Sequence, residues 1–275
     1  METNNTLVIK PSKGLAGLKI RELIQYRGLL YFLVWRDIKV KYKQTLLGVA
    51  WAVLQPLLTM IVFTIFFGNM ANMPSDGVPY PIFSYSGLLI WTYFATAVNF
   101  SSQSLVGNQQ LVTKIYFPRI LITMGATVAG LLDYVIALVI LVVMMFWYQI
   151  VPSVELLLLP VVILFGFLTA TGIGMWLSAL NVKYRDVRYV VPFLVQLWLF
   201  LTPVIYPVSL FSESKYQWLL ALNPMTGVVE AHRAVILGTT VELSTLGISA
   251  GVAVFLFISG LFYFKQMERS FADVI

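Results

Sequence analysis

The run ILITMGATVAGLLDYVIALVILVVMMFWY, residues 120–148, contains a single charged side chain, Asp133. A helix of about 20 mainly apolar residues is enough to cross the hydrocarbon core of a bilayer, so this run is predicted to be a membrane span. Because a charge at bilayer depth costs about 2.5–3.5 kcal/mol on insertion scales, we expect Asp133 to be buried against protein, protonated or facing water. A structural hydrogen bond or a wet crevice is favoured over a proton relay, which one acid does not make.

The rest of the chain has the same character. Of its 275 residues, 59% are hydrophobic and 11% are charged, whereas soluble domains carry about 25% charged residues. The sequence therefore predicts an all-α integral membrane protein with six transmembrane helices, at 46–70, 82–104, 120–148, 156–180, 189–208 and 244–264. Prolines such as Pro203 lie within these spans, where neighbouring helices can satisfy the freed backbone groups.

The distribution of basic residues predicts the orientation. All of the 18 Lys and Arg residues except Lys215 and Arg233 fall on one side of this arrangement. Cytosolic loops are enriched in Lys and Arg, so both termini are predicted to be cytosolic. The net charge of +6 suits anionic lipid headgroups better than nucleic acid, because the cations lie between apolar runs and not on one soluble face.

The chain is predicted to form one domain over residues 1–275, since it shows no internal repeat. Its parts are an N-terminal tail (1–24), an amphipathic interface helix (25–45), the six spans (46–264) and a cytosolic tail (265–275). In the interface helix, Val34, Trp35, Ile38 and Tyr42 share one arc at about 100° per residue, and most cations lie outside it. This pattern is typical of a helix in the headgroup layer, although an ordinary basic flank of a span contains the same residues.

An external segment runs from Ser209 to Leu243, between the fifth and sixth spans. Its apolar pieces, around 216–222 and 226–237, are too short to cross a bilayer. Asn223-Pro224 marks a turn between them. We expect an external re-entrant helical hairpin here.

Two predicted cytosolic turns combine cations with aromatic side chains. LVGNQQLVTKIYFPRI, residues 105–120, is either an extension of the second span or a short exposed helix that fits a groove in a cytosolic protein. LNVKYRDVRYVVPF, residues 180–193, places Arg185, Asp186 and Arg188 between two tyrosines. Arginine binds phosphate through paired planar donors, and Asp186 could hold one arginine in place. A positive anchor at the membrane surface would select the same residues.

Aromatic side chains are abundant, with 7 Trp, 14 Tyr and 19 Phe. Aromatic belts at membrane interfaces are normal. The alternative is a conduit in which flat rings contact the C–H faces of sugars and let a polar chain slide through. The candidates for this channel lining are Phe63, Phe67, Tyr85, Trp91, Tyr93, Trp198, Phe200 and Tyr206.

Several kinds of chemistry are missing from the sequence. It contains no cysteine, one histidine, His232, and no G-x-x-x-x-G-K-[ST] phosphate loop. We therefore expect no metal site, no cofactor in this chain and no nucleotide hydrolysis by it. Uphill transport would take its energy from another subunit.

Four stretches, in order, resemble the membrane-spanning subunit of ABC-2-type polysaccharide exporters. They are WRDIKVKYKQTLLGVAWAVLQPLL from Trp35, KIYFPRI from Lys114, LNVKYRDVRYVVPFLVQLWLFLTPVIYP from Leu180 and LNPMTGVVEAHR from Leu222. The resemblance covers the chain from about residue 25 to its end. It implies export of a lipid-linked O-antigen, capsule or teichoic-acid polymer across the inner membrane.

The same resemblance implies an assembly and a role for each segment. The permease would be a homodimer on two cytosolic ATPase subunits, which bind the ATP and Mg, and its first and fifth spans would line a channel. The interface helix would be 27–43, and the re-entrant pair would be 214–237, with Glu230, His232 and Arg233 at the exit. The ATPase coupling helix would include Gln109, Gln110, Lys114, Tyr116, Phe117 and Arg119. The cytosolic mouth, which meets the lipid-linked phosphate, would include Tyr184, Arg185, Asp186, Arg188, Arg36 and Lys39.

Three other functions fit the sequence less well. An ABC-2 exporter of a small molecule or drug would share the fold, since aromatic side chains bind drugs as well as sugars. An integral-membrane enzyme acting on polyprenyl-linked sugars would need clustered carboxylates or histidines, and the acids here are scattered. A proton-driven secondary transporter is disfavoured by the lone Asp133 and the lack of an inverted repeat.

Overall fold

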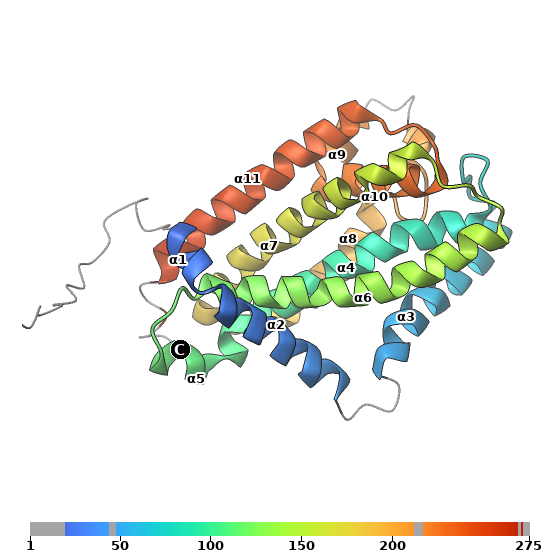
Figure 1. Ribbon diagram of the computed structural model, residues 1–275. Helices are drawn as coiled ribbons and strands as arrows, with labels where there is room; N and C mark the ends of the chain where they lie inside the picture. The colour runs from blue at the N-terminus through green and yellow to red at the C-terminus, as the bar shows by residue number, and fades with distance from the viewer. Residues whose placement is uncertain (1–19, 44–47, 212–216, 269–270, 272–275) are drawn as a thin grey trace, which may run out of the picture.

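The computed structural model describes residues 20–43, 48–211, 217–268 and 271, and this part of the chain is helical with no strand (Figure 1). Most of the predicted N-terminal tail, the first residues of the predicted hairpin and the last residues of the chain lie outside the described residues. In order, the α-helices are α1 (Ile20–Gln25), α2 (Arg27–Tyr42), α3 (Gly48–Phe63), α4 (Tyr80–Gly107), α5 (Gln109–Lys114), α6 (Ile120–Trp147), α7 (Leu159–Lys183), α8 (Val187–Leu201), α9 (Gln217–Leu222), α10 (Pro224–Leu237) and α11 (Leu243–Met267). A π-helical stretch, Thr64–Met70, continues α3, a 3₁₀ turn, Val154–Leu158, precedes α7, and another, Val208–Phe211, precedes α9.

Four helical stretches are long and apolar enough to cross a membrane. They are Gly48–Met70, Ile120–Trp147, Val154–Lys183 and Leu243–Met267. These stretches correspond to the first, third, fourth and sixth predicted spans. The predicted class, an all-helical membrane protein, is confirmed at this level.

Helix α4, at the position of the second predicted span, is the centre of the bundle. It packs against α3, α6, α7, α8 and α10, and most of its side chains are buried. Its second half is polar, with Ser101, Ser102 and Ser104 all buried. Because protein rather than lipid surrounds this helix, hydroxyl groups are tolerated and bond to neighbouring helices, as Ser104 does to Thr123 of α6 at 3.3 Å.

Helix α8, at the position of the fifth predicted span, is shorter than predicted. It ends at Leu201 and not at 208, and Thr202 is already extended. Pro203 follows directly, and a proline disfavours the helical conformation at the residue before it. A helix of 15 residues spans only about 22 Å.

The turn between α9 and α10 lies at Asn223-Pro224, where the sequence predicts it. The Asn223 side chain accepts a hydrogen bond from the Met225 backbone N–H at 3.1 Å, which caps α10, and Pro224 occupies its first turn. Asn223 also accepts a bond from Trp198 Nε1 at 3.0 Å and donates to Thr202 Oγ1 at 2.9 Å. One side chain thus fixes the start of α10 against the end of α8.

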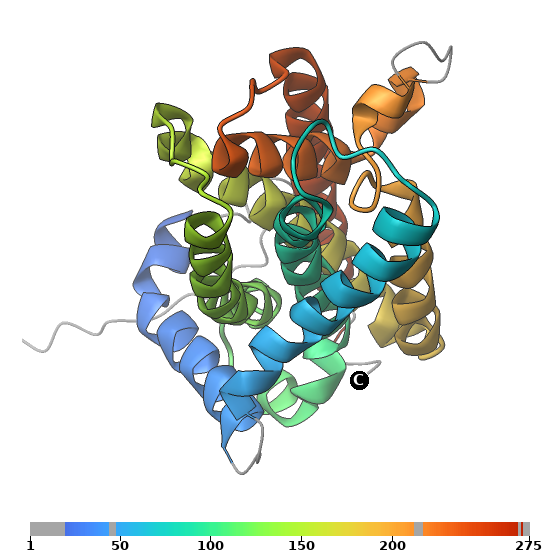
Figure 2. The same ribbon diagram turned by 90° about the vertical axis from the view of Figure 1, so that its right-hand side faces the viewer.

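The bundle has two chemically different ends. The first, here the α5 end, contains α1, α5, the start of α6 and the last turns of α7 and α11; the second, the α10 end, contains α9, α10 and the 71–79 loop (Figure 1). Helices α2 and α3 lie at the outside of the bundle (Figure 2). Among the described residues the α10 end has one cation, Arg233, together with the acids Asp76, Glu155, Glu230 and Glu242, whereas the α5 end carries Lys114, Arg119, Lys183, Arg185, Arg188 and Lys265.

Candidate functional site

The basic turn between α7 and α8 lies fully exposed at the α5 end. Helix α7 ends at Lys183, Tyr184 is extended and α8 begins at Val187. The side chains of Tyr184, Arg185, Asp186 and Arg188 are all exposed. Two of the cations lie against the ring of a neighbouring tyrosine: Lys183 Nζ lies 5.1 Å from the Tyr184 ring centre, and the Arg188 guanidinium lies 4.6 Å from that of Tyr189.

Asp186 does not hold either arginine of this turn in place in the structure. It forms no ion pair with Arg185 or Arg188, and its side chain makes no capping bond to α8. Arg188 instead donates to the Tyr189 hydroxyl at 2.8 Å. Both guanidinium groups are thus available to an anion from outside the subunit.

The two α2 residues assigned to the same mouth lie on a different helix. Arg36 pairs with its neighbour Asp37 at 2.7 Å, and Lys39 Nζ lies 5.2 Å from the Trp35 ring centre. Helix α2 packs mainly on α6. The structure therefore separates the predicted mouth into two groups, one on α2 and one between α7 and α8.

The segment from α5 to α6 combines exposed and buried predicted residues. Gln109, Gln110 and Lys114 are exposed, and the Tyr116 side chain is 86% exposed. Phe117 is buried at 4% exposure, in an apolar cluster with Leu33 of α2 and Phe264 of α11. Phe117 is thus part of the core, and Tyr116 is the exposed aromatic side chain of this segment.

Arg119, the last predicted residue of this segment, is tied to the end of α11. The Glu268 carboxylate accepts from the Arg119 backbone N–H at 3.1 Å, and Arg119 Nη1 donates to the Glu268 carbonyl at 2.8 Å. Lys265 donates to the same carboxylate at 2.7 Å. Sequence reasoning missed Glu268, since 149 residues separate it from Arg119.

The eight predicted channel aromatics have different surroundings. Tyr85, Trp91 and Tyr93 of α4 are at most 4% exposed and lie inside the subunit. Trp198 packs edge-on to Trp91, and Phe63 packs edge-on to Phe67. Tyr206 donates to the Phe200 carbonyl at 3.1 Å. Phe200, on α8, is 52% exposed and is the member of the set most accessible from outside the subunit.

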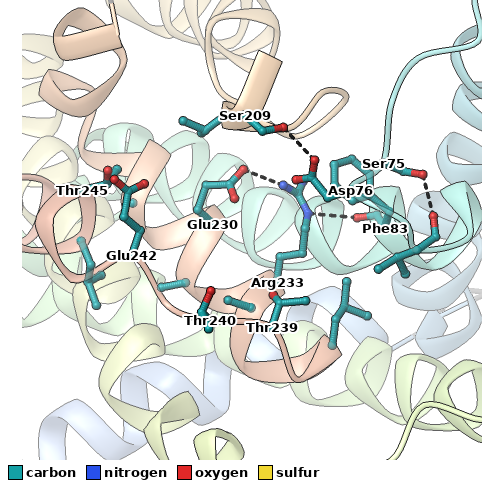
Figure 3. Close-up of a pocket in the computed structure, with 17 residues that line it drawn as sticks. Ser75, Asp76, Phe83, Ser209, Glu230, Arg233, Thr239, Thr240, Glu242 and Thr245 are labelled. Carbon is teal, nitrogen blue, oxygen red and sulfur yellow. Dashed lines mark hydrogen bonds and ion pairs between the residues drawn. The ribbon is translucent and has the colours of Figure 1, made fainter. Parts of the chain in front are cut away.

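The α10 end contains a cavity of about 490 Å³ whose lining mixes apolar with charged and hydroxyl side chains (Figure 3). Its carboxylates are Asp76, Glu230 and Glu242, and Arg233 lies among them. Arg233 Nη1 donates to Glu230 at 2.7 Å, and Asp76 accepts from Ser209 at 2.7 Å. Burial raises the pKa of Glu230, and the adjacent Arg233 opposes that shift.

Arg233 and His232, predicted at the exit, both point into the protein. Arg233 is 4% exposed and donates to the carbonyls of Phe83, Pro203 and Val204. His232 lies 2.7 Å from the Tyr134 hydroxyl of α6, and burial lowers the pKa of its imidazole to about 3. A neutral His232 therefore joins α10 to α6, and Arg233 joins α10 to α4 and the end of α8.

Asp133 has protein partners that the sequence did not indicate. Lys41 and Tyr42, at the end of α2, both donate to its carboxylate. The prediction of a structural hydrogen bond is therefore confirmed. In the described part of the chain no group of three or more His, Asp or Glu side chains could hold a metal ion.

These features describe a helical membrane protein with a basic, aromatic end, an acidic, hydroxyl-lined end and no nucleotide-binding motif in its sequence. Residues 28–237 match the family described as ABC-2 type transporter. The chain belongs to this family.

The chain is similar over nearly its whole length to several proteins of that kind. It is 33% identical over 260 residues to the O-antigen export system permease protein RfbA of Myxococcus xanthus, covering 93% of this chain and 98% of the relative. A protein of the same name in Klebsiella pneumoniae is 26% identical over 90% of this chain and 95% of its own length. The polysialic acid transport protein KpsM of Escherichia coli is 23% identical over 86% of this chain and 92% of its own.

Proposed function

We propose that this chain is the permease subunit of an ABC exporter that moves a lipid-linked polysaccharide from the cytosolic to the external side of the inner membrane. The observation that carries the proposal is the 33% identity to an O-antigen export permease over almost the entire chain. The polymer is of the O-antigen, capsule or teichoic-acid type. A named polysialic acid transporter among the relatives supports a polymer rather than a small molecule as cargo.

The orientation follows from the charges. The α5 end, where the described cations gather, is cytosolic under the positive-inside rule, and the α10 end is external. Helices α4 and α8 then complete six spans, α2 is the interface helix, and α9 and α10 form the re-entrant hairpin. Support for the hairpin comes from α10 itself, whose 14 residues extend only about 21 Å and are mostly buried by other helices.

The assembly follows from the exposed surfaces. Tyr116, exposed at the cytosolic end, docks on the ATPase subunit that supplies ATP hydrolysis. Helices α3 and α8 expose apolar faces that include Trp51, Leu58, Phe193 and Leu197, and in a homodimer these faces surround the channel. Phe200 lies on that face, whereas the buried Tyr85, Trp91 and Tyr93 serve the interior of the subunit.

The lipid carrier meets the basic turn. Two exposed guanidinium groups, those of Arg185 and Arg188, lie at the cytosolic start of α8, and neither pairs with Asp186. Phosphate bound by such groups forms short, charge-assisted hydrogen bonds. The acidic exit end repels the same phosphate, which favours release of the polymer outward.

Reconstitution tests the proposal. The chain and its ATPase subunit are placed in proteoliposomes with a lipid-linked polysaccharide, and polymer is detected on the far side with a membrane-impermeant glycosidase. We expect transfer that depends on ATP and stops with a hydrolysis-deficient ATPase. Transport of drug-like molecules without any movement of polymer would instead identify an exporter of small molecules.

A further inference from the structure

The carboxylate of Asp133 is the place where α2 is attached to the bundle by polar contacts. Lys41 donates to one of its oxygens and Tyr42 to the other, so both oxygens are occupied by the last two residues of α2. The Asp133 side chain is 17% exposed, and the Lys41 ammonium also lies 5.4 Å from the Phe100 ring centre of α4. The end of α2 is thus fixed to α6 and lies against α4.

Apolar packing holds the earlier part of α2 on the same helix. Leu33 is 1% exposed, and a Cβ built on Gly125 of α6 would lie 3.4 Å from the Leu33 Cβ. Leu33 and Lys41 are eight positions apart on α2, as are Gly125 and Asp133 on α6. The two helices therefore stay in contact over this length, and the ion pair defines where the contact ends.

The contact between Asp133 and the end of α2 also limits where α3 can begin. Helix α2 ends at Tyr42 and α3 starts at Gly48, and a chain advances at most about 3.3–3.6 Å per residue. The start of α3 at Gly48, here called its inner end, therefore stays within about 20–22 Å of the end of α2. A small cavity confirms the proximity, because Ala52 and Pro56 of α3 line it together with Asp133.

Helix α3 packs on α4 and α6 and only slightly on α2, and much of its surface faces away from the subunit. Over its most apolar 18 residues only 11% are buried, the lowest share of the four long apolar helices. These contacts are apolar: the side-chain hydrogen bonds of the helix stay within it, and among the described residues none joins α3 to another helix. The position of the inner end of α3 is therefore set from α2 and α6.

We propose that Asp133, Lys41 and Tyr42 are positioning residues that fix the inner end of α3 and carry movement of α2 and α6 to it. The burial of the Tyr42 phenol and its bond to Asp133 raise the pKa of Tyr42, which keeps it a proton donor to the carboxylate. The geometry is independent of the cargo. Its consequence for transport rests on the proposed exporter function, in which α3 lines the channel.

A distance measurement on the permease alone tests the geometry. The natural sequence has no cysteine, so Val40→Cys and Val49→Cys, at side chains 73% and 51% exposed, can carry two spin labels. We expect a narrow distance distribution between α2 and α3, and a clearly broader one after Asp133→Asn. An unchanged distribution in the Asp133→Asn protein overturns the proposal, whatever the cargo is.

The consequence for transport is tested by measuring how much polymer the complete permease–ATPase complex exports per ATP hydrolysed. In Asp133→Asn we expect export per ATP hydrolysed to fall by at least about fivefold, the low end of typical coupling effects, while hydrolysis continues. The charge swap Lys41→Asp with Asp133→Lys restores the pair and should recover most of the loss. Asp37→Asn is the matched control, since it removes a carboxylate of α2 whose ion pair, in the described part of the chain, is with Arg36 alone.

A purely structural role gives a different result. If hydrolysis and export fall together, in proportion to the subunit present in the membrane, the residues only support folding and the proposal is wrong. Should Asp133→Asn fail to accumulate, Lys41→Gln is measured in its place, and the proposal requires the same uncoupling from it.

Discussion

Arg233 shows how much a single side chain can connect in this bundle. Its guanidinium bonds to Glu230 of α10, to the Phe83 carbonyl of α4 and to two carbonyls that follow α8. Its charge lies 3.8 Å from the Phe83 ring centre. It reaches these partners only because residue 87 of α4 has no side chain, and a Cβ there would lie 2.7 Å from Arg233 Nη2.

Gly87→Ala should therefore destabilise the protein. Alanine gains about 1 kcal/mol over glycine in a helix, but displacing the guanidinium loses bonds to a charged group worth about 1.5–3 kcal/mol each. We expect a net loss of about 1–2 kcal/mol, measured as a lower unfolding temperature in detergent. Gly130→Ala of α6 is the control, because its Cβ would meet Tyr93 at an ordinary 3.5 Å; equal stability losses in both variants would contradict this account.

At the other end of the bundle, substitutions in the basic turn between α7 and α8 can distinguish phosphate recognition from a simple positive anchor at the membrane surface. Arg185→Lys with Arg188→Lys keeps both charges but loses the paired planar donors. We expect correct insertion, shown by a C-terminal topology reporter, with reduced polymer at the cell surface, and a larger loss for the two glutamine variants. Wild-type export by the lysine pair would mean that the charge alone is sufficient.

Among the elements, the segment between α5 and α6 has one exposed aromatic side chain, Tyr116, and one buried aromatic side chain, Phe117. Tyr116→Ala removes an exposed side chain, which changes stability by only about 0.5 kcal/mol, and should weaken ATPase association at normal subunit levels. Phe117→Ala opens the buried cluster and should cost about 3–5 kcal/mol, seen as less subunit in the membrane. Co-purification of the ATPase, normalised to permease, separates the two effects; normal association of the Tyr116 variant would exclude this docking surface.

Long apolar runs allowed the sequence to place the major helices, because their length and composition are local properties. The end of α8 was misplaced, since the apolar run continues beyond Leu201 and the effect of Pro203 was judged from its tolerance in membrane helices. The face of α2 was only partly predicted. Periodicity grouped Val34 with Trp35, whereas the structure buries Leu33 against α6 and leaves Trp35 47% exposed.

On the scale of the whole molecule, the contacts that organise the candidate site join distant parts of the sequence. Lys41 and Asp133 are 92 residues apart, and Arg119 and Glu268 are 149 apart. The sequence shows that these charged residues exist. Which of them contact one another depends on how the helices pack, and a local sequence pattern carries no information about that packing. The same holds for Tyr85, Trp91 and Tyr93, which look like channel residues in the sequence and are core residues in the fold.

The whole subunit should also depend on another protein for energy. Its sequence has no phosphate loop, and it belongs to a family of transporter permeases. The purified chain is therefore expected to hydrolyse no ATP, and hydrolysis should appear when the ATPase subunit is added. Phosphate release by the pure subunit, undiminished by further purification, would contradict this expectation.

The close crossing of α7 and α11 has a mechanical consequence. A Cβ on Gly260 would lie 2.3 Å from the Gly172 carbonyl oxygen, and one on Gly172 would lie 2.6 Å from the Phe257 backbone nitrogen. Main chain meets main chain here without side chains between them that could change rotamer and absorb a displacement. We expect the two helices to move as one stiff unit, so that the deformation that opens a passage for a polymer falls on α3 and α8, whose outer faces are exposed in the described part of the chain.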